Sequence, residues 1–494
     1  MSPENFFHPV LKIYENTIFI YCLVIFAVQI LLMILARLEI RRNVFVNKFW
    51  DIKEIEKSAV IPGISVIAPA YNESSTIIDN VRSLLTLYYP KFELIIVNDG
   101  STDDTLQKLI DAYSLIEVDY SYEPAVLSQP IRGFYKSTNK AYKHLLVIDK
   151  VNGKCKADAI NAGLNAAVFP YFLNTDVDCI LHRNTLLYLI RPFLTEQKRV
   201  LAVGAAIRMV NSSHVDGGLI TGLKPPRNIW ARFQEMEYIR AFVMAKVGWS
   251  RLNAVPNISG ALGLFDKEVV LNVGGYDPGS LGEDMDITIR MVKYACRHKF
   301  DYIIKQLPQT LCWTEGPETL RVLKRQRVRW ARGLWQLFWR NLHLLFNPRY
   351  RATGLIMYPY TFFFELFAPI LESIGIIYYI VQISSGTLPW TNATILLIFI
   401  YCFSVFISTI SVLYDQLVFH QEKYKKLSEV IGIALMVFIE PLLYHPFVLY
   451  CSLTGYLSQC TKLKPVWGNM QRKGFKSDSE PPVTDPESSY DFQA

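Results

Sequence analysis

The chain has 494 residues, of which 51% are apolar and 19% are charged. This composition excludes a disordered chain and argues against a wholly soluble one, because about 25% of residues are charged in typical soluble domains. The net charge of +7 is a modest excess that does not indicate a nucleic-acid partner. The eight scattered cysteines contain no C-x-x-C pair, so we expect neither a disulfide framework nor a zinc site, and a reducing compartment.

An uncharged apolar run near the N-terminus predicts a first membrane span at about residues 16–37, within an N-terminal unit of residues 1–50. The run is long enough to cross a bilayer core of about 30 Å and too long for the apolar part of a signal peptide. Several basic residues follow it, beginning at Arg37, whereas only Lys12 precedes it. The positive-inside rule therefore places the N-terminus outside and the chain after Arg37 in the cytoplasm.

A second apolar region covers residues 353–460. Its first run, 355–385, is too long for one simple span and is expected to kink near Pro369. The next run, 393–414, is a clean span. These patterns predict a C-terminal transmembrane region.

The last apolar run, residues 430–457, has basic segments on both sides, so we expect it to turn back as a bent hairpin, giving four or five spans in all. Three acids lie inside these apolar runs: Glu365 and Glu372 in the first and Glu440 in the last. Such acids either face a cavity or a partner, or lie at the headgroups. The pattern leaves both interpretations open.

Composition divides the rest of the chain. Residues 51–57 are a charged linker, 58–312 form a globular domain, and 313–352 are a basic, Trp-rich interface segment. Residues 461–494 form a tail expected in the cytoplasm, and its end, from 477 onward, is rich in proline, serine and acids and is expected to be disordered.

The globular domain alternates strand and helix patterns, which predicts a parallel sheet with ligands at the carboxyl ends of its strands. The expected strands are residues 64–68, 93–97, 145–148 and 171–175. Asp99 follows the second of these, although beside Gly100 it is equally compatible with a simple turn. Asp176 and Asp178 follow the last, where two carboxylates can share Mg²⁺ or Mn²⁺ or form a solvated loop.

Two further patterns point to a catalytic cleft. Glu283 and Asp284 open a helix, where they either complement the helix dipole or supply a general base. Six basic residues lie between Arg321 and Arg332. They suit an amphipathic helix on anionic lipid, or a clamp on a departing diphosphate with Trp330 as a stacking surface for sugar.

Taken in order, Asp99, Asp176-Val177-Asp178, Glu283-Asp284 and the Q-x-x-R-W element of residues 326–330 resemble the motifs of membrane-embedded family 2 glycosyltransferases. This family includes cellulose, chitin, hyaluronan and poly-N-acetylglucosamine synthases. The resemblance covers residues 64–335 and is closest to a little-characterised bacterial subgroup. It implies an α/β cytoplasmic GT-A domain (a nucleotide-diphospho-sugar transferase fold) inserted between α-helical transmembrane segments, with amphipathic interface helices. The expected location is the cell membrane (inner or plasma), with several passes.

The resemblance also implies roles for particular residues. The donor side would comprise Ala70, Tyr71 and Glu73 around the nucleobase, Asp99 on the uridine, Lys156 and Asp158 near the donor sugar, and Asp176 and Asp178 on Mg²⁺ or Mn²⁺. The catalytic and acceptor side would comprise Asp284 as base with Glu283 beside it, and Gln326, Arg327, Arg329 and Trp330 at the acceptor and pyrophosphate.

By resemblance, the expected activity is inverting transfer from a UDP-sugar to a β-linked polysaccharide, processive and coupled to passage through the membrane. One alternative is transfer of a single sugar to a lipid, and another is a silent membrane scaffold or receptor. Expected partners are the nucleotide sugar, a glycan or lipid acceptor, membrane lipids and, in an envelope with two membranes, export proteins.

The sequence shows no C-terminal cyclic-nucleotide-binding pattern of the bacterial cellulose synthase kind and no match to that enzyme's gating loop, so we do not expect regulation by that route. Residues 312–317 suggest a loop with a related closing role. Trp313 within it is equally compatible with anchoring at the membrane interface.

Overall fold

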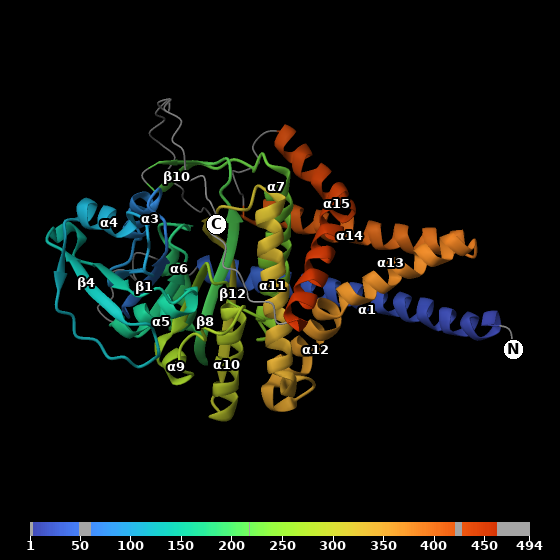
Figure 1. The fold of residues 1–494 in the computed structure, drawn as a ribbon, viewed down its shortest axis with the longest axis horizontal. Coiled ribbons are helices and arrows are strands. Elements are labelled where there is room, and N and C mark those ends of the chain that lie inside the picture. The colour runs from blue at the N-terminus through green and yellow to red at the C-terminus, as the bar shows by residue number, and fades with distance from the viewer. Residues whose placement is uncertain (1–2, 49–60, 217, 420–426, 462–494) are drawn as a thin grey trace.

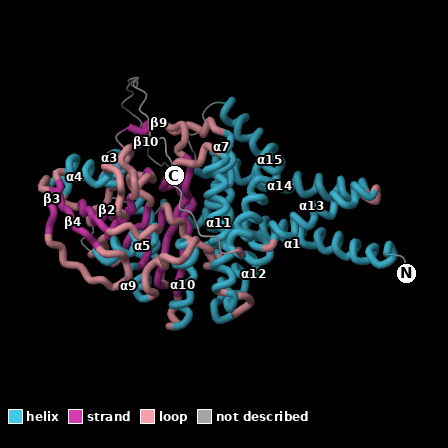
Figure 2. The backbone as a smooth tube through the Cα atoms, viewed as in Figure 1, coloured by secondary structure: helices cyan, strands magenta, loops and turns pink. Residues whose placement is uncertain are grey.

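The structure is a computed structural model that describes residues 3–48, 61–216, 218–419 and 427–461. The predicted linker and disordered tail lie outside these ranges. Strands are confined to one side of the molecule, and long helices occupy the other (Figure 2). The structure therefore combines an α/β part with long apolar helices, as the predicted fold class requires.

A ten-stranded mixed sheet forms the centre of the globular part, in the order β3-β4-β5-β2-β1-β6-β11-β8-β12-β7. Its strands are β1 (Ile64–Ala70), β2 (Phe92–Asn98), β3 (Leu115–Val118), β4 (Ile131–Ser137), β5 (Leu145–Lys150), β6 (Tyr171–Thr175), β7 (Ile180–Leu181), β8 (Arg199–Met209), β11 (Leu262–Asp266) and β12 (Tyr302–Thr314). A separate hairpin pairs β9 (His214–Asp216) with β10 (Leu219–Gly222).

The expected parallel pairing is present at the centre of the sheet and again between β8 and β12, but not throughout. Strands β5, β2, β1 and β6 run parallel, whereas β4 and β11 pair with their neighbours antiparallel. The loop expected at residues 312–317 is also wrong in its first half, because β12 continues to Thr314. Trp313 pairs with Ile180 and is buried, so it neither anchors at a membrane surface nor closes over the site.

Alternation along the central strands explains the two helical layers. In β1, Ile64, Val66 and Ala68 face one apolar core while Ile67 faces the other. The first core holds α3 (Ile77–Leu85) and α6 (Thr185–Thr195), and the second holds α5 (Lys156–Ala166), α9 (Lys267–Asn272) and α10 (Glu283–Arg297). Helix α4 (Thr105–Tyr113) contacts α3, and the short turn η1 (Lys140–Tyr142) precedes β5.

Helical segments join the sheet to the membrane region. They are α7 (Ile229–Tyr238), the π-helix η2 (Ile239–Ala245), α8 (Lys246–Arg251), the basic helix α11 (Leu320–Arg340), η3 (Leu342–Leu344) and η4 (Pro348–Tyr350). The α11 helix is anchored on the globular part: Gly333 contacts Gly282, and Gln336 accepts from the Leu281 amide at 3.0 Å. This helix is the predicted interface segment.

Four helical stretches of the described chain are long and apolar enough to cross a membrane: Asn16–Val46, Thr353–Ser385, Trp390–Gln416 and Ile431–Cys460. They belong to α1 (Pro3–Lys48), to the run of η5 (Thr353–Met357), α12 (Tyr358–Tyr360), η6 (Thr361–Leu366) and α13 (Ala368–Ser385), to α14 (Trp390–Phe419) and to α15 (Leu427–Cys460). The second stretch is interrupted at Phe367, next to the kink expected at Pro369.

The predicted hairpin in the last apolar run is wrong, because α15 is one helix of 34 residues with Pro441 and Pro446 inside it. Its last turns run beside α11: Lys324 donates to the Tyr450 hydroxyl at 2.8 Å and Arg332 to Gln459 at 3.2 Å. In Figure 1, α1, α13 and α14 extend away from the sheet, whereas α11 and the end of α15 run across their direction. The structure therefore has one continuous helix where a hairpin was expected.

Buried ion pairs tie the membrane helices to the globular part. Arg208 at the end of β8 pairs with Asp415 of α14 and lies 3.7 Å from Glu235 of α7. Arg240 of η2 donates to the two carboxylate oxygens of Glu440 of α15 through its terminal nitrogens Nη1 and Nη2. Because a buried charge is costly without its partner, these pairs fix the position of the helices relative to the sheet.

Candidate active site

The predicted donor-side acids lie together at the carboxyl ends of the central strands, because β1, β2, β5 and β6 run parallel. Ala70 ends β1 and is buried, and its carbonyl accepts from the Asp99 amide at 2.9 Å. Asp99 follows β2, and Asp176 and Asp178 follow β6. These residues thus lie at the strand ends where the sequence predicted them.

The loop after β1 is fixed to the loop after β2. Asn72 adopts a left-handed backbone (φ 55°), and its side chain accepts from the Thr102 amide at 2.8 Å. Glu73 donates its amide to the Thr105 hydroxyl at 2.9 Å. These contacts leave Tyr71 with 41% of its surface exposed, as a ring that stacks on a nucleobase requires.

A fully buried lysine supports Asp99 from below. Lys150 Nζ lies 2.5 Å from an oxygen of Asp99 and 2.5 Å from an oxygen of Asp158. Asp99 also accepts from the Gly153 amide at 3.0 Å, and Asp158 from the Gln129 amide at 2.9 Å. Asp158, expected near the donor sugar, is thus a buried partner of Lys150 that holds three loops together.

Lys156 lies between Asp176 and Glu283, one of the two acids predicted to be catalytic. Its Nζ lies 2.5 Å from Asp176 Oδ1 and donates to the Gly260 carbonyl at 2.6 Å. Burial lowers the pKa of Lys156, but Asp176 and Glu283 outweigh that effect and raise it, so the ammonium keeps its charge. A fixed positive charge at this point suits a phosphate group.

The D-x-D acids form a candidate cation site. Ligand atoms of Asp176, Asp178 and Cys179 all lie within 4.8 Å of one another. Two carboxylates with open positions for phosphate oxygens fit Mg²⁺ or Mn²⁺, which take hard oxygen ligands. The chemistry of these donors therefore fits the expected metal.

Glu283 and Asp284 lie at the first turn of α10, as predicted. Asp284 accepts from Asn257 Nδ2 at 2.6 Å and from the Met285 amide at 2.8 Å, which fixes the carboxylate at the helix N-terminus. Burial, together with the charge of Asp284, raises the pKa of Glu283, while Arg329 and Lys156 oppose the shift. The two acids therefore differ in environment, with Glu283 between cations and Asp284 held by amides.

The Q-x-x-R-W residues divide between two surroundings. Gln326 accepts a hydrogen bond from Gln234 at 3.0 Å. The positive charge of Arg329 acts to lower the pKa of Glu283. The Trp330 side chain is 38% exposed. Arg327, expected at the pyrophosphate, is buried: it donates to Glu237 of α7 at 2.6 Å and to the Tyr444 hydroxyl of α15 at 2.8 Å. It also lies over the Trp330 ring at 4.4 Å. Position 327 thus connects the site to the membrane helices.

Sequence reasoning missed several supporting residues. Lys150 carried one signal, a lone cation at the end of an apolar strand, but nothing in the sequence indicated that it would meet two acids. Asn257 carried none, because its partner Asp284 is 27 positions away. Lys246 of α8, whose pKa burial lowers to about 8 against the charges of Asp284 and Glu365, was equally hidden.

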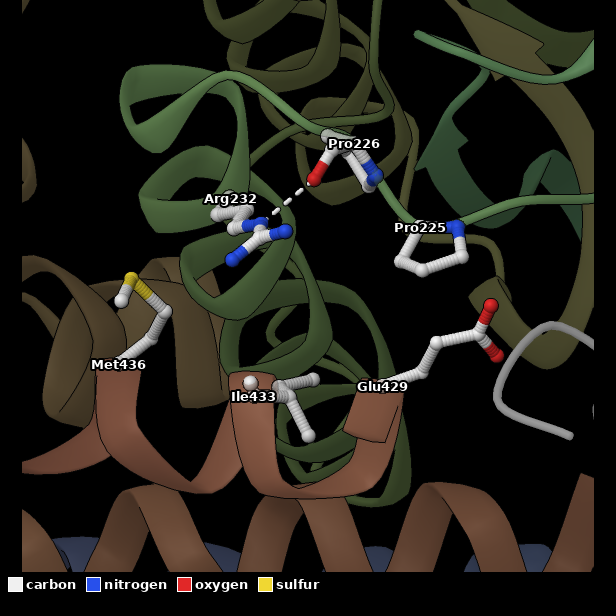
Figure 3. A pocket seen from close by; sticks show the side chains of 7 residues that line it. Pro225, Pro226, Arg232, Glu429, Ile433 and Met436 are labelled. Atoms are coloured by element: carbon white, nitrogen blue, oxygen red, sulfur yellow. Dashed lines mark hydrogen bonds between the residues drawn. The ribbon is translucent and has the colours of Figure 1, made fainter. Parts of the chain in front are cut away.

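A separate cavity of about 260 Å³ lies between the segment before α7 and the first turns of α15 (Figure 3). It is lined by Pro225, Pro226, Arg232, Glu429, Gly432, Ile433 and Met436. Arg232 donates to the Pro226 carbonyl at 2.6 Å there. None of the predicted site residues lines this cavity.

Residues 62–333 match the family described as "Glycosyltransferase like family 2". The match covers more than half of the chain, and the chain belongs to this family of glycosyltransferases. The fold and the order of the site acids agree with that membership.

Curated relatives include poly-beta-1,6-N-acetyl-D-glucosamine synthases. The protein of Staphylococcus epidermidis (strain RP62A) is 30% identical over 298 residues, covering 60% of this chain and 60% of that protein. The protein of Staphylococcus aureus (strain COL) is 31% identical over 287 residues, covering 58% and 57%. The chain thus matches about three fifths of the length of these relatives.

Among solved structures, the mannosyltransferase PcManGT from Pyrobaculum calidifontis, in complex with GDP-Man and Mn²⁺, covers 88% of this chain and 99% of its own. The TM-score is 0.50 at 16% identity. At this identity the similarity concerns the fold alone, and it confirms the predicted GT-A class.

Proposed function

We propose that the chain is a membrane-bound inverting glycosyltransferase that extends a β-linked polysaccharide from a UDP-sugar. The observation that carries this proposal is a series of alternating charges at the carboxyl ends of the central strands. It consists of Asp176, Lys156, Glu283 and Arg329, with Asp284 beside Glu283. The named relatives support N-acetylglucosamine as the first sugar to test.

The donor would lie along that edge, with its nucleobase against Tyr71 and its uridine on Asp99. Asp176 and Asp178 would hold Mg²⁺ or Mn²⁺, which neutralises the diphosphate when bound. Lys156 and Arg329 supply two further positive charges for the leaving group. The donor side therefore carries the charge that departure of a nucleoside diphosphate requires.

Asp284 is the proposed general base. It takes the proton of the acceptor hydroxyl, the freed oxygen bonds to the anomeric carbon, and the bond from that carbon to the diphosphate breaks. One base and no carboxylate nucleophile give a single displacement, so an α-linked donor yields a β-linked product. Asn257 keeps the Asp284 carboxylate oriented for this role.

For the membrane arrangement we propose three crossings, made by α1, α13 and α14, with the end of α15 lying along α11 at the cytoplasmic surface. This arrangement keeps the catalytic domain and the basic segment after α15 in the cytoplasm, as the positive-inside rule requires. The Arg327–Glu237–Tyr444 contacts place polar groups between the site and α15, where a product chain could leave. We include in this proposal that the enzyme is processive and that export proteins receive its product.

Purified full-length protein in detergent, given radiolabelled UDP-N-acetylglucosamine or UDP-glucose with Mn²⁺, tests the proposal. A long product retarded in gels supports polymerisation. A single-sugar product in the organic phase replaces it with transfer to a lipid. No transfer and no hydrolysis with any nucleotide sugar overturns the enzymatic assignment in favour of a scaffold.

A further inference from the structure

A second cavity, of about 150 Å³, lies where the C-terminal end of α1 meets α6 and β12. A void of about this size can hold a molecule as large as benzene. None of the residues proposed for the donor, cation or acceptor sites lines it. Its lining includes Glu39, Arg42, Arg191, Glu196, Lys305 and Gln306.

Two buried donors on this lining have no acceptor among the residues that the structure describes. Arg191 is 3% exposed and Gln306 is 2% exposed, and neither Arg191 Nη1 nor Gln306 Nε2 has a hydrogen-bond partner there. Leaving a buried donor unpaired is costly, and more so when the group is charged. Two such donors from different elements, α6 and β12, therefore indicate a ligand that accepts hydrogen bonds.

The other charges around the cavity balance, whereas Arg191 adds an excess positive charge. Lys305 lies 2.9 Å from Glu39, and Arg42 lies 3.0 Å from Glu196. Arg191 makes no ion pair with a described residue. Burial lowers the pKa of Arg191 to about 10, and nearby charges offset only part of the shift, so the guanidinium stays charged at neutral pH. The ligand that suits this lining is therefore an anion with several oxygens.

The position of the cavity along α1 brings it to the level of lipid headgroups. The uncharged run of this helix ends at Ala36, and Glu39 and Arg42 follow about 4.5–9 Å further along the helix axis. The headgroup layer is about 5–7 Å thick on each side of the apolar core. In the membrane arrangement proposed above, the cavity thus begins where phospholipid phosphates lie on the cytoplasmic side. Arg42 keeps 44% of its side chain exposed, so the lining is not sealed from outside.

We propose that this cavity binds the phosphate group of an anionic lipid, with Arg191 and Gln306 as its buried hydrogen-bond donors. An arginine side chain presents parallel N–H groups that match phosphate oxygens, and a glutamine amide donates without adding charge. A free phosphate ion offers the same oxygens, but the position at the end of α1 favours a lipid. The lipid as source rests on the proposed membrane arrangement, whereas the phosphate chemistry rests on the lining alone.

Native mass spectrometry of the full-length protein in detergent, with phosphatidylglycerol titrated, tests this inference. Wild type should bind phosphatidylglycerol more tightly than diacylglycerol, which lacks the phosphate. Arg191→Met should bind it about tenfold to a hundredfold more weakly, the scale for a hydrogen bond to a charged group. Gln306→Leu should weaken binding by about two- to tenfold. Arg297→Met, at the exposed end of α10, is the matched control and should bind as wild type does.

Melting temperatures without lipid show whether the variants fold. Arg191→Met should melt no lower than wild type, because it removes a buried charge that has no ion-pair partner among the described residues. Gln306→Leu provides an independent variant that keeps this charge and removes only the amide.

Three outcomes would overturn the inference. Equal phosphatidylglycerol affinity of wild type, Arg191→Met and Gln306→Leu would mean that the cavity holds water only. An equal loss of affinity in Arg297→Met would mean a general attraction of lipid to surface charge. Inorganic phosphate that displaces bound phosphatidylglycerol at equal concentration would overturn the lipid as source and keep the phosphate site. None of these outcomes depends on sugar transfer, so this inference and the proposed function can fail separately.

Discussion

Replacement of Lys150 by methionine tests whether its buried amine stabilises the strand ends where the nucleotide is proposed to bind. Its Nζ lies 2.5 Å from both Asp99 and Asp158, and no part of its side chain is exposed. The variant leaves two carboxylates buried without their cation. Breaking such a pair costs about 3–5 kcal/mol. At about 2–4 °C per kcal/mol for a domain of this size, the melting temperature should fall by about 6–20 °C.

Thermal unfolding of the full-length protein in detergent measures this change, and UDP titration measures its effect on the site. We expect weaker UDP binding, because Asp99 loses the contact that fixes its carboxylate. The exposed Lys143→Met is the matched control and should melt as wild type does. Lys150→Met/Asp158→Asn should recover part of the loss, since one stranded charge is removed. A single variant that melts and binds UDP like wild type would refute the reasoning.

Three further predictions concern the base, the pH response and the membrane arrangement. Asp284→Asn should lower transfer by about 10²–10⁴ while UDP still binds, whereas Asn257→Ala should lower it less; retained turnover would remove Asp284 from its role. The folded pKa of Lys246 is about 8 against 10.5 unfolded, so the unfolded chain binds more protons between these values. In thermal melts, the free energy of unfolding of the wild type relative to Lys246→Met should therefore rise with pH across that window. A difference that does not change with pH would contradict the shift. Cys460, exposed at the end of α15, should react with impermeant maleimide from the cytoplasmic side only; labelling from outside would mean that α15 crosses.

Local patterns in the sequence were enough to predict the apolar helices, the central strands and the edge at which the acids gather. Long runs of uncharged residues predict membrane helices because a helix pairs its backbone groups within one segment, as lipid requires. Asp99 and Asp176 lie at the same end of the sheet because each directly follows one of the parallel strands. The family resemblance then connected Glu283 and Asp284 to this edge.

Flanking strands and the last helix could not be predicted in the same way. Strand β4 is only half-buried, and β12 carries polar residues such as Lys305 and Gln309 whose partners lie on α1, so neither has an apolar run typical of a central strand. For α15, the basic residues on both sides of the apolar run led us to expect a hairpin. Only the tertiary structure shows one helix, with Tyr450 and Gln459 in its last turns bonded to α11.

The sequence by itself determined that this is a membrane protein of low charge content with a row of acids on an α/β domain. Tertiary structure decided which charges are displayed and which are buried. Asp158 and Arg327 were both expected at the ligand site, but they are buried in ion pairs with Lys150 and Glu237. Asp176 and Trp330, by contrast, are partly exposed. The sequence does not distinguish a buried charge from an exposed one, because that difference depends on partners brought together from distant parts of the chain.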